Sequence, residues 1–499
     1  MARRKRNPQN DAGSAAAEAA ALERFRPLLS AEELASLEAE LQRPLHPAIR
    51  LNPLKVAPAA ALAELAARYG WETRPVPYCA NGWWVTAAQT PVGQTLEHRL
   101  GYYYVQDAAS MLPVELFDFE AGSAPLILDM AASPGGKTTH LVANSGDRGL
   151  VVANDSSQGR ITALRLVLQN WSAIHAVVTR FPGERLGAWF PETFDRVLLD
   201  APCSMQSLRS TEAHPMRPIT EREQASLALR QARLLESALQ AVKVGGQVVY
   251  STCTLAPEED EAVLDAVLKR LAGAARIENV RSRLPKAAPG LTDDGRQRFD
   301  PAVQQAVRLW PHRYGTSGFF AARLTKQAPL ELARQSPPGR PWAQTGLSPL
   351  STAQVAGLAA SWLDWYGFDL RLLMEQQGFS LWEKGETLYA IPVAYLRHFA
   401  ELPFQSIGLA LGEEIPAGVV PSHEWVTRFS GHFRDGRYRL PAEFLAAWNR
   451  GEDIRPAPAA AYPAGTVVVV EDEAGHLLGR GKILADRLRN LLPRRLVFS

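Results

Sequence analysis

The sequence predicts an α/β fold with a parallel, doubly wound sheet at its centre, and three observations predict it. Between residues 126 and 271, short apolar runs alternate with stretches of helical periodicity, as in sheets covered by helices on both faces. A glycine-rich segment over residues 131–137, called the glycine loop below, follows the first apolar run. Two cysteines, Cys203 and Cys253, each stand just after a later run. These features indicate a Rossmann-like core whose ligands bind at the carboxyl ends of the strands.

The composition is that of a globular protein with several domains. The chain has 499 residues, of which 46% are hydrophobic and 21% charged, and at about 150 residues per domain it contains roughly three domains. No apolar run approaches the roughly 18 residues that cross a bilayer, and no apolar segment follows the basic start at residues 3–6, so no secretory signal is indicated. Three cysteines form neither a disulfide framework nor, alone, a zinc site. We expect a cytoplasmic monomer without metal or membrane contact.

Residues 1–118 predict an N-terminal helical module that binds RNA. Over residues 17–42, apolar residues recur at three- and four-residue spacings, which is typical of helices; they are Leu22, Phe25, Leu28, Leu29, Leu34, Leu37 and Leu41. A further helix is predicted from Pro58 to Tyr69. Proline suits a first helical turn, and Gly70 stands where a C-cap belongs.

Residues 119–326 predict the Rossmann-like domain. Its strands are expected at residues 126–128, 149–153, 176–178, 197–199 and 247–250, and its helices at residues 137–144, 157–170, 221–242 and 258–271. Residues 317–324 predict one more strand, which would close an edge of the sheet.

The remaining residues predict two C-terminal units. A proline-rich stretch after Lys326 indicates a linker, which opens a linker and middle domain over residues 327–454. A second stretch, rich in proline and alanine, precedes two short strands at residues 465–470 and 476–483. We therefore expect a small β unit over residues 455–499.

The glycine loop is a candidate cofactor site. It connects the strand ending at Asp129 to the next helix and consists of Ala131, Ala132, Ser133, Pro134, Gly135, Gly136 and Lys137. Glycines let a ligand approach the backbone, and the start of the helix offers unpaired N–H groups. The segment Gly136-Lys137-Thr138 matches the end of a phosphate-binding Walker loop, but Ala131 stands where that motif requires glycine. A triphosphate site is therefore disfavoured.

Asp155 is a candidate ribose ligand. It follows the second strand of the core, and an acid at that position can accept hydrogen bonds from ribose hydroxyls of NAD or S-adenosylmethionine. The Gly-x-Gly-x-x-Gly spacing of dinucleotide sites is absent, which favours S-adenosylmethionine. The alternative is that Asp155 only caps the helix that begins near Ser157.

The two cysteines predict covalent chemistry at the same edge of the sheet, unless both are inert buried thiols. Ring carbon 5 of cytosine is a poor nucleophile, and addition of a thiolate to carbon 6 makes it able to accept a methyl group. Asp200, at the end of the strand before Cys203, is suited to hold a proton at ring nitrogen 3 if burial keeps its carboxyl protonated. This reasoning does not say which cysteine attacks.

Three motifs resemble the signature of the NOL/NOP2/Sun family of RNA cytosine-C5 methyltransferases; they are residues 129–138, 200–204 and 250–254. Weaker similarity covers residues 50–52, 101–110 and 318–322. The resemblance implies that Cys253 is the nucleophile and that Cys203 promotes product release. It also implies that the glycine loop, Asp155 and Asp200 contact S-adenosylmethionine, with Lys137 near Asp200.

The chain departs from the family pattern at three places. Members usually have Gly-Glu-Gly after the Pro-Cys-Ser motif, and this chain has Met205-Gln206-Ser207, which puts the positioning of the base in doubt. Many members have an acid after the third strand that reaches the adenine; here residues 179–183 contain none. The cysteine that usually opens the glycine loop is Ala131. None of these changes removes a catalytic residue.

The basic C-terminus predicts contacts with RNA phosphates. The candidate residues are Arg480, Lys482, Arg487 and Arg489. Residues 381–384 and 478–493 resemble the C-terminal extension and PUA-like RNA-binding domain of the family's bacterial small-subunit rRNA branch. We therefore expect an S-adenosylmethionine-dependent RNA cytosine-C5 methyltransferase whose partner is 16S rRNA or the small ribosomal subunit. The alternatives are a tRNA cytosine-C5 methyltransferase and a non-catalytic RNA-binding ribosome-assembly factor.

Overall fold

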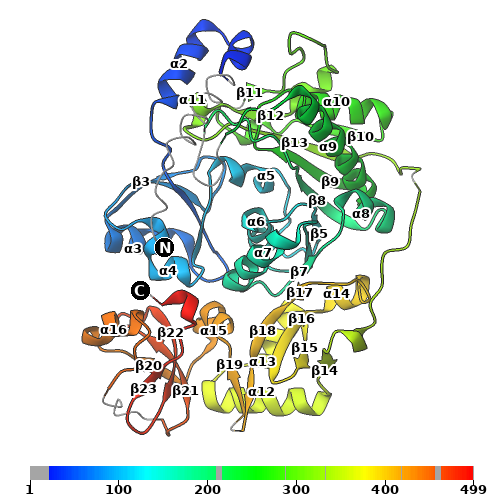
Figure 1. The fold of residues 1–499 in the computed structure, drawn as a ribbon. Helices are drawn as coiled ribbons and strands as arrows, with labels where there is room; N and C mark the ends of the chain where they lie inside the picture. The colour runs from blue at the N-terminus through cyan, green and yellow to red at the C-terminus, as the bar shows by residue number, and fades with distance from the viewer. Residues whose placement is uncertain are drawn as a thin grey trace.

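The computed structural model describes residues 22–209, 216–286, 288–331, 333–416, 418–455 and 462–497. Their strands form four sheets (Figure 1). From the N-terminal sheet to the C-terminal one, these sheets contain four, ten, five and four strands. The basic run at residues 3–6 lies outside the described residues. In the part of the chain that the structure describes, no helix is long and apolar enough to span a bilayer.

The N-terminal module contains a sheet beside its helices. Helix α2 (Ala31–Leu41) lies within the predicted helical region, and α3 (Pro58–Tyr69) confirms the second predicted helix. The sheet order is β2-β3-β1-β4, with β1 (Ala48–Leu51), β2 (Trp71–Pro75), β3 (Gly82–Ala88) and β4 (Tyr103–Val105). Sequence analysis missed this sheet because β1 is buried along its whole length, so it lacks the alternation of a half-buried strand. The module is therefore not purely helical.

The central sheet confirms the predicted Rossmann-like core. Its parallel strands follow the order β9-β8-β5-β6-β7; they are β5 (Leu126–Asp129), β6 (Leu150–Asn154), β7 (Ala176–Thr179), β8 (Phe194–Asp200) and β9 (Val242–Thr252). The helices of this domain are α6 (Gly136–Asn144), α7 (Gln158–Trp171), α8 (Gly183–Trp189), α9 (Glu221–Ala241) and α10 (Glu261–Arg270). Every residue of β5, β6 and β7 is buried, as expected for strands covered on both faces.

Both edges of the central sheet differ from the prediction. Strand β13 (Phe319–Lys326) pairs with β9 but is not an edge strand, because β12 (Val307–Leu309), β11 (Ala288–Pro289) and β10 (Ala275–Glu278) lie beyond it. The opposite edge is β17 (Ser406–Ile407), which comes from the C-terminal half and pairs with β7. These added strands are too short to show a periodic pattern in the sequence.

The middle C-terminal domain is built on an antiparallel sheet. Its strands are β14 (Ser348–Pro349), β15 (Phe379–Lys384), β16 (Thr387–Pro392), β18 (Leu409–Ile415) and β19 (Gly418–Pro421). The accompanying helices are α12 (Thr352–Tyr366), α13 (Leu370–Gln377), α14 (Val393–His398) and α15 (His423–Phe429).

The last sheet begins earlier than the sequence indicates. Strands β21 (Val467–Glu471) and β22 (Leu477–Ile483) confirm the two predicted strands, and β23 (Leu488–Asn490) continues the sheet. The first strand, β20 (Arg437–Arg439), pairs with β21 in parallel. The expected boundary at residue 455 therefore falls inside this unit. Helix α16 (Leu445–Asn449) follows β20 and precedes that boundary in the chain.

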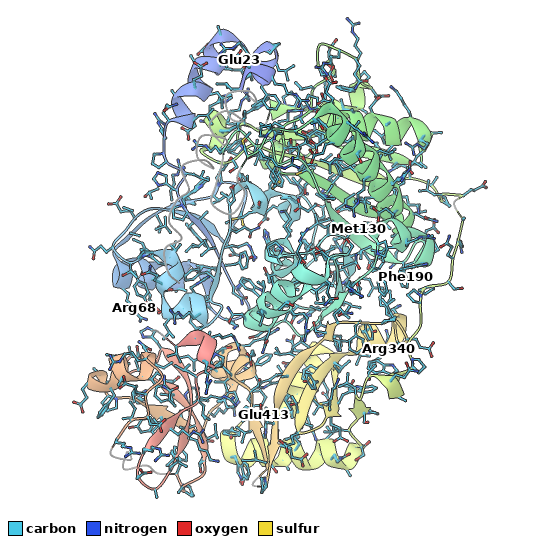
Figure 2. The ribbon with its side chains drawn as sticks, viewed as in Figure 1. Glu23, Arg68, Met130, Phe190, Arg340 and Glu413 are labelled. Atoms are coloured by element: carbon cyan, nitrogen blue, oxygen red, sulfur yellow. The ribbon has the colours of Figure 1, made fainter. Side chains whose placement is uncertain are left out.

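Helix α15 attaches the C-terminal half to the core through a buried ion pair. Arg428 pairs with Asp147 and donates a hydrogen bond to the Ser172 carbonyl at 2.7 Å. The Asp147 carboxylate also accepts the N–H groups of Ile174 and His175, each at 2.9 Å. A second contact is made by Arg68, which Figure 2 labels. Its guanidinium lies 3.1 Å from Nδ1 of His476 in the C-terminal half. The modules are thus joined by specific polar contacts as well as by apolar packing.

We expect Arg428→Met to lower the free energy of unfolding by about 3 kcal/mol, because it leaves the buried Asp147 carboxylate unpaired. Urea denaturation followed by tryptophan fluorescence measures this loss. Arg450→Met is the control, since Arg450 and Glu452 are both 53% exposed and such pairs contribute about 0–1 kcal/mol. Equal losses in the two variants would show that the Arg428–Asp147 pair does not stabilise the domain interface.

Candidate active site

The glycine loop lies at the carboxyl end of β5 and leads into α6. Gly135 has a φ of +116°, and a Cβ at this position would lie 2.9 Å from Val167 on α7. Gly136 opens α6, where a Cβ would lie 2.9 Å from the Tyr104 ring. Close packing therefore requires both glycines. The first N–H groups of α6 have no partner within the helix and are available to a ligand at this edge.

Asp155 lies beside the glycine loop and is buried. Its Oδ1 accepts the N–H of Ser157 at 2.9 Å. Its Oδ2 accepts the N–H of Ser133 at 3.2 Å and lies 3.3 Å from Arg160. Asp155 therefore fixes the turn that leads into α7, although it does not cap the first turn of that helix, and it also holds the glycine loop. Because a carboxylate has about four acceptor positions, ribose binding by Asp155 stays a prediction that this geometry permits.

Lys137 and Asp200 form the pair that the family resemblance implies. Lys137 Nζ is 2.8 Å from Asp200 Oδ2, and Ser251 donates to Oδ1 at 2.8 Å. The Asp200 side chain is 29% exposed, so it is not fully buried, and its role in holding a proton at ring nitrogen 3 stays a prediction. Burial acts to lower the pKa of Lys137, but Asp200, with smaller contributions from Cys253 and Asp129, raises it on balance. The proton of this pair therefore resides on Lys137.

The two active-site cysteines meet at the ends of β8 and β9. Their Sγ atoms are 3.1 Å apart, because these parallel strands place Asp200 opposite Ser251 and leave the sheet together. Both side chains are partly exposed, unlike a pair of inert core thiols. The hydrogen bond with Cys253, together with burial, raises the pKa of the Cys203 thiol well above its ordinary value. Cys203 therefore keeps its proton at neutral pH.

Asp129 supplies a buried acid beneath this arrangement. Thr138 Oγ1 donates to Asp129 Oδ2 at 2.7 Å, whereas Oδ1 is buried and has no hydrogen-bond partner among the described residues. Burial raises the pKa of Asp129 to about 7, and the Asp200 carboxylate adds to this effect. A buried acceptor without a partner is rare in folded proteins and fits a ligand that donates a hydrogen bond there.

Sequence analysis gave Arg50 no role, yet this side chain supports the glycine loop. Arg50 is fully buried and donates to the Gly136 carbonyl at 2.9 Å and to Thr139 Oγ1 at 2.8 Å. Its guanidinium lies 4.8 Å from the centre of the Trp171 ring. Burial lowers the pKa of Arg50 to about 10, so it stays charged at neutral pH. The sequence feature that could have identified Arg50 is its charge within the otherwise apolar segment Ala48–Leu51.

The loop that departs from the family pattern contains a left-handed residue. Met205 has a φ of +58°, a conformation that costs a residue with a side chain roughly 1–2 kcal/mol, and it stands where the family usually has glycine. The loop is nevertheless well held: the Gln206 carbonyl accepts Leu255 N–H at 3.1 Å, and the Ser207 carbonyl accepts Gly318 N–H at 2.7 Å. The departure therefore stores strain beside Cys203 without opening the loop.

The four predicted RNA-binding residues fall into two groups. Arg480 donates to the Pro421 carbonyl at 2.6 Å, and Arg487 lies 2.9 Å from Asp453 and 3.0 Å from Asp486, so both are occupied within the protein. Lys482 and Arg489 are directly opposite each other on β22 and β23. Neither forms an ion pair within the described ranges, and like charges in this position repel each other unless an anion lies between them.

A potential group of metal ligands lies away from the cysteine pair. Among the described residues, the ligand atoms of Cys79, Glu115 and His140 are within 4.8 Å of one another. His140 Nε2 is 3.0 Å from Glu115 Oε1, so a hydrogen bond explains their contact. Burial strongly raises the pKa of the Cys79 thiol, which disfavours the thiolate that binds metals. The absence of a metal stays a prediction.

The fold and site together define a Rossmann-fold methyltransferase with a two-cysteine centre. A family model described as 16S rRNA methyltransferase RsmB/F matches residues 119–325, and one for the N-terminal domain of 16S rRNA methyltransferase RsmF matches residues 19–108. The ribosomal RNA small subunit methyltransferase F of Klebsiella pneumoniae is 33% identical over 92% of each chain. That of Vibrio campbellii is 31% identical over 95% of this chain and 96% of its own. The chain belongs to the ribosomal RNA small subunit methyltransferase F family.

Solved structures agree with this assignment. A methyltransferase homolog from Pyrococcus horikoshii has a TM-score of 0.52 and 27% identity, covering 62% of this chain and 99% of its own. NSun6 from the same organism, solved with the S-adenosylmethionine analogue SFG, has a TM-score of 0.51 and 20% identity, covering 62% and 97%; at this identity it shows the fold alone. Membership of the methyltransferase family confirms the predicted cofactor, S-adenosylmethionine.

We expect Asp129→Asn to remove a pH-dependent contribution to stability. The folded-state pKa of Asp129 is raised to about 7, so its stabilising contribution is fully present below about pH 4 and is lost as the pH rises through about 7. The free energy of unfolding of the wild type, relative to the variant, should fall by up to about 1.4 kcal/mol per pH unit in this window. Urea denaturation at pH 5 and pH 8 measures the change. Asp364→Asn, at an exposed position, is the control, and an equal pH response of both variants would contradict the assignment.

Proposed function

We propose that this protein is an S-adenosylmethionine-dependent RNA methyltransferase that forms 5-methylcytosine in 16S rRNA of the small ribosomal subunit, in the cytoplasm. The observation that carries the proposal is the 3.1 Å separation of the Cys203 and Cys253 sulfurs at the sheet edge that also holds the Lys137–Asp200 pair. A thiol pair beside a proton-holding pair matches the needs of covalent methylation at a pyrimidine carbon. Family membership supports rRNA as the substrate.

The residues around the glycine loop fit the cofactor. The unpaired N–H groups at the start of α6, the Asp155 carboxylate and the unpartnered Oδ1 of Asp129 surround one edge of the sheet. When bound there, S-adenosylmethionine supplies the methyl group that carbon 5 of the cytosine accepts. Ala131 to Lys137, Asp155 and Asp200 are the residues proposed to hold it.

Cys253 is the proposed nucleophile, and the charges around the two sulfurs support this order. Lys137 interacts electrostatically with Cys253, and this interaction helps to raise the pKa of Lys137. Cys203, in contrast, keeps its proton. The Cys253 sulfur forms a bond to carbon 6. The electrons of the carbon 5–carbon 6 double bond are displaced through the ring toward nitrogen 3, which takes up a proton. Lys137 provides that proton through Asp200.

Release reverses the addition. The proton on carbon 5 leaves, the carbon 6–sulfur bond breaks, and the double bond forms again with Cys253 restored as thiolate, while nitrogen 3 returns its proton to the Lys137–Asp200 pair. The hydrogen bond with Cys253 makes the largest contribution to the raised pKa of Cys203. When Cys253 is bonded to the base, this contribution is gone, and Cys203 becomes able to exchange protons with the adduct. This order of events suits the release role proposed for Cys203.

Two alternatives receive less support. A tRNA substrate would use the same chemistry, but the matched relatives are named for the small ribosomal subunit. A non-catalytic assembly factor is suggested only by the Met205–Ser207 departure, and the structure keeps Cys203, Cys253, Asp200 and Lys137 in contact.

We expect Cys203→Ala, mixed with small-subunit rRNA and cofactor, to form a covalent protein–RNA band on a denaturing gel, because Cys253 can add to the base but release is blocked. The double variant Cys203→Ala with Cys253→Ala should form no band. Cys79→Ala, which alters the buried cysteine outside the site, should behave as wild type. If neither variant gives a band while RNA binding is demonstrated, the nucleophile assignment is wrong.

Lys482 and Arg489 are the proposed phosphate contacts of the last sheet. Deleting the residues after Ala461 would remove three of the four strands of this sheet and expose its core, so charge reversal is the cleaner test. We expect Lys482→Glu with Arg489→Glu to weaken rRNA binding and to reduce the slope of log affinity against log salt by about 2, since each phosphate contact contributes about 0.9. Filter binding at several salt concentrations measures both quantities.

The control for this charge reversal is Arg371→Glu with Arg397→Glu, two exposed residues of the middle domain. It makes the same change in net charge at a different surface. If the control weakens RNA binding as much as the test variant, only overall charge matters, and Lys482 and Arg489 are not specific contacts.

A further inference from the structure

An acidic segment next to Cys253 is buried rather than solvated. Glu258, Glu259 and Asp260 precede α10 and Glu261 opens it, so they would ordinarily form an exposed, acidic helix start. Glu259, Asp260 and Glu261 are each 0% exposed, whereas the Glu258 side chain is 27% exposed. Three buried acids in succession carry a high desolvation cost, so the partners of each acid reveal its role.

Two of these acids are neutralised locally. Glu261 forms a buried ion pair with Arg308, whose Nε is 2.7 Å from Glu261 Oε1. Asp260 accepts a hydrogen bond from Thr252 Oγ1 at 2.6 Å. Burial raises the pKa of Asp260 well above its ordinary value, although Arg308 opposes this effect, so Asp260 is protonated. Neither acid leaves a net charge at this place.

Glu259 differs because its hydrogen-bond partners belong to the Cys203 loop and to α9. Its Oε2 accepts the Ser204 N–H at 2.9 Å and the Gln231 Nε2 at 3.0 Å. Its Oε1 is 3.4 Å from Gln224 Nε2. Three N–H donors are therefore aimed at one buried carboxyl group, and within the described residues Glu259 has no ion-pair partner.

The same network encloses Cys203 from both sides. Gln231, which is fully buried, uses its Nε2 to reach the Pro202 carbonyl at 2.8 Å as well as Glu259. Pro202 precedes Cys203 and Ser204 follows it. The peptide groups on either side of Cys203 are therefore fixed to one buried carboxylate, directly by Ser204 and through Gln231 by Pro202.

We propose that Glu259 is a positioning residue of the methyl-transfer reaction, which holds the loop carrying Cys203 and controls the release step in which Cys203 acts. This inference rests on the proposed function of Cys203. The Glu259 charge also contributes to the raised pKa of the Cys203 thiol, after the Cys253 hydrogen bond and burial. Once Cys253 is bonded to the base, burial and the Glu259 interaction remain, so Glu259 affects how readily Cys203 gives its own proton to solvent and then takes up the proton of carbon 5.

The test variant is Glu259→Gln, which keeps the size of the side chain but removes its charge. We expect it to accumulate the covalent protein–RNA adduct about tenfold over wild type during turnover, because release slows more than addition. Glu258→Gln is the matched control: it is the neighbouring residue, but its partner is Arg24 rather than the Cys203 loop. It should leave adduct levels unchanged.

A second measurement needs no RNA and does not depend on turnover. In a Cys253→Ala background, the pH dependence of Cys203 alkylation by iodoacetamide, read by peptide mass spectrometry, reports the ionisation of Cys203 directly. We expect Glu259→Gln to move the midpoint of this profile down by about one pH unit. Gln231→Met keeps the Glu259 carboxylate and its contact with Ser204, but removes the hydrogen bonds of Gln231 to both Glu259 and Pro202. It should raise adduct levels without this shift.

The outcomes separate the two proposals. If Cys203→Ala itself traps no adduct, the proposed function fails, and the alkylation profile still tests the coupling of Glu259 to Cys203. If Cys203→Ala traps adduct but Glu259→Gln neither traps it nor shifts the alkylation profile, the positioning role is refuted. Circular dichroism of each variant establishes whether it is folded. If Glu259→Gln does not fold, Gln231→Met tests the loop anchor in its place.

Discussion

The parallel pairing of β8 with β9 is the constraint on which the rest of the site depends. With Asp200 opposite Ser251, both strands end at the same level, and the residues that follow them, Cys203 and Cys253, are brought into sulfur–sulfur contact. A shift of the register by one residue would turn every side chain of a strand to the other face. The neighbouring strand β5 then places Lys137, through the glycine loop, against Asp200. Strand pairing, rather than any local sequence feature, therefore assembles the chemistry.

Buried charge is concentrated at this same edge. Asp129, Lys137 and Arg50 lie beneath or beside the glycine loop, and Glu259 lies behind the Cys203 loop. Groups held in this way are costly to bury and typically mark functional sites. Their arrangement is also asymmetric, with the ammonium of Lys137 toward Cys253 and the carboxylate of Glu259 toward Cys203. The two side chains in contact thus have different electrostatic surroundings, which suits the division of labour proposed between nucleophile and releasing group.

The sequence predicts those parts of the molecule that have strong local patterns. The five parallel strands, helix α3 and the placement of both cysteines at the carboxyl edge follow from apolar runs, capping residues and motif order. Strand β17 could not be predicted, since its two residues pair with β7 from a distant part of the chain. Arg480 shows the same principle for a side chain: it is basic and near a basic terminus, but folding turns it toward the Pro421 carbonyl. From the sequence alone, the acidic residues 259–261 are expected to be exposed to solvent at the start of a helix. Only the folded structure shows that they are buried.

The N-terminal module acts as a rigid connection between the last β unit and the glycine loop. On one side, Leu96 and Leu100 pack in the same apolar cluster as Trp448 and Leu488 of the last unit. On the other, Arg50 holds the Gly136 carbonyl, and Tyr104 lies against Gly136. Between them, Lys55 donates to the Leu100 and Asn170 carbonyls and to Thr427 on α15. The last sheet, on which Lys482 and Arg489 are proposed to bind RNA phosphates, is therefore connected to the region of the cysteine pair through packed and hydrogen-bonded residues. Fixed geometry of this kind lets binding energy gained far from the reacting base orient that base, because orientation is useful only when the intervening structure does not bend.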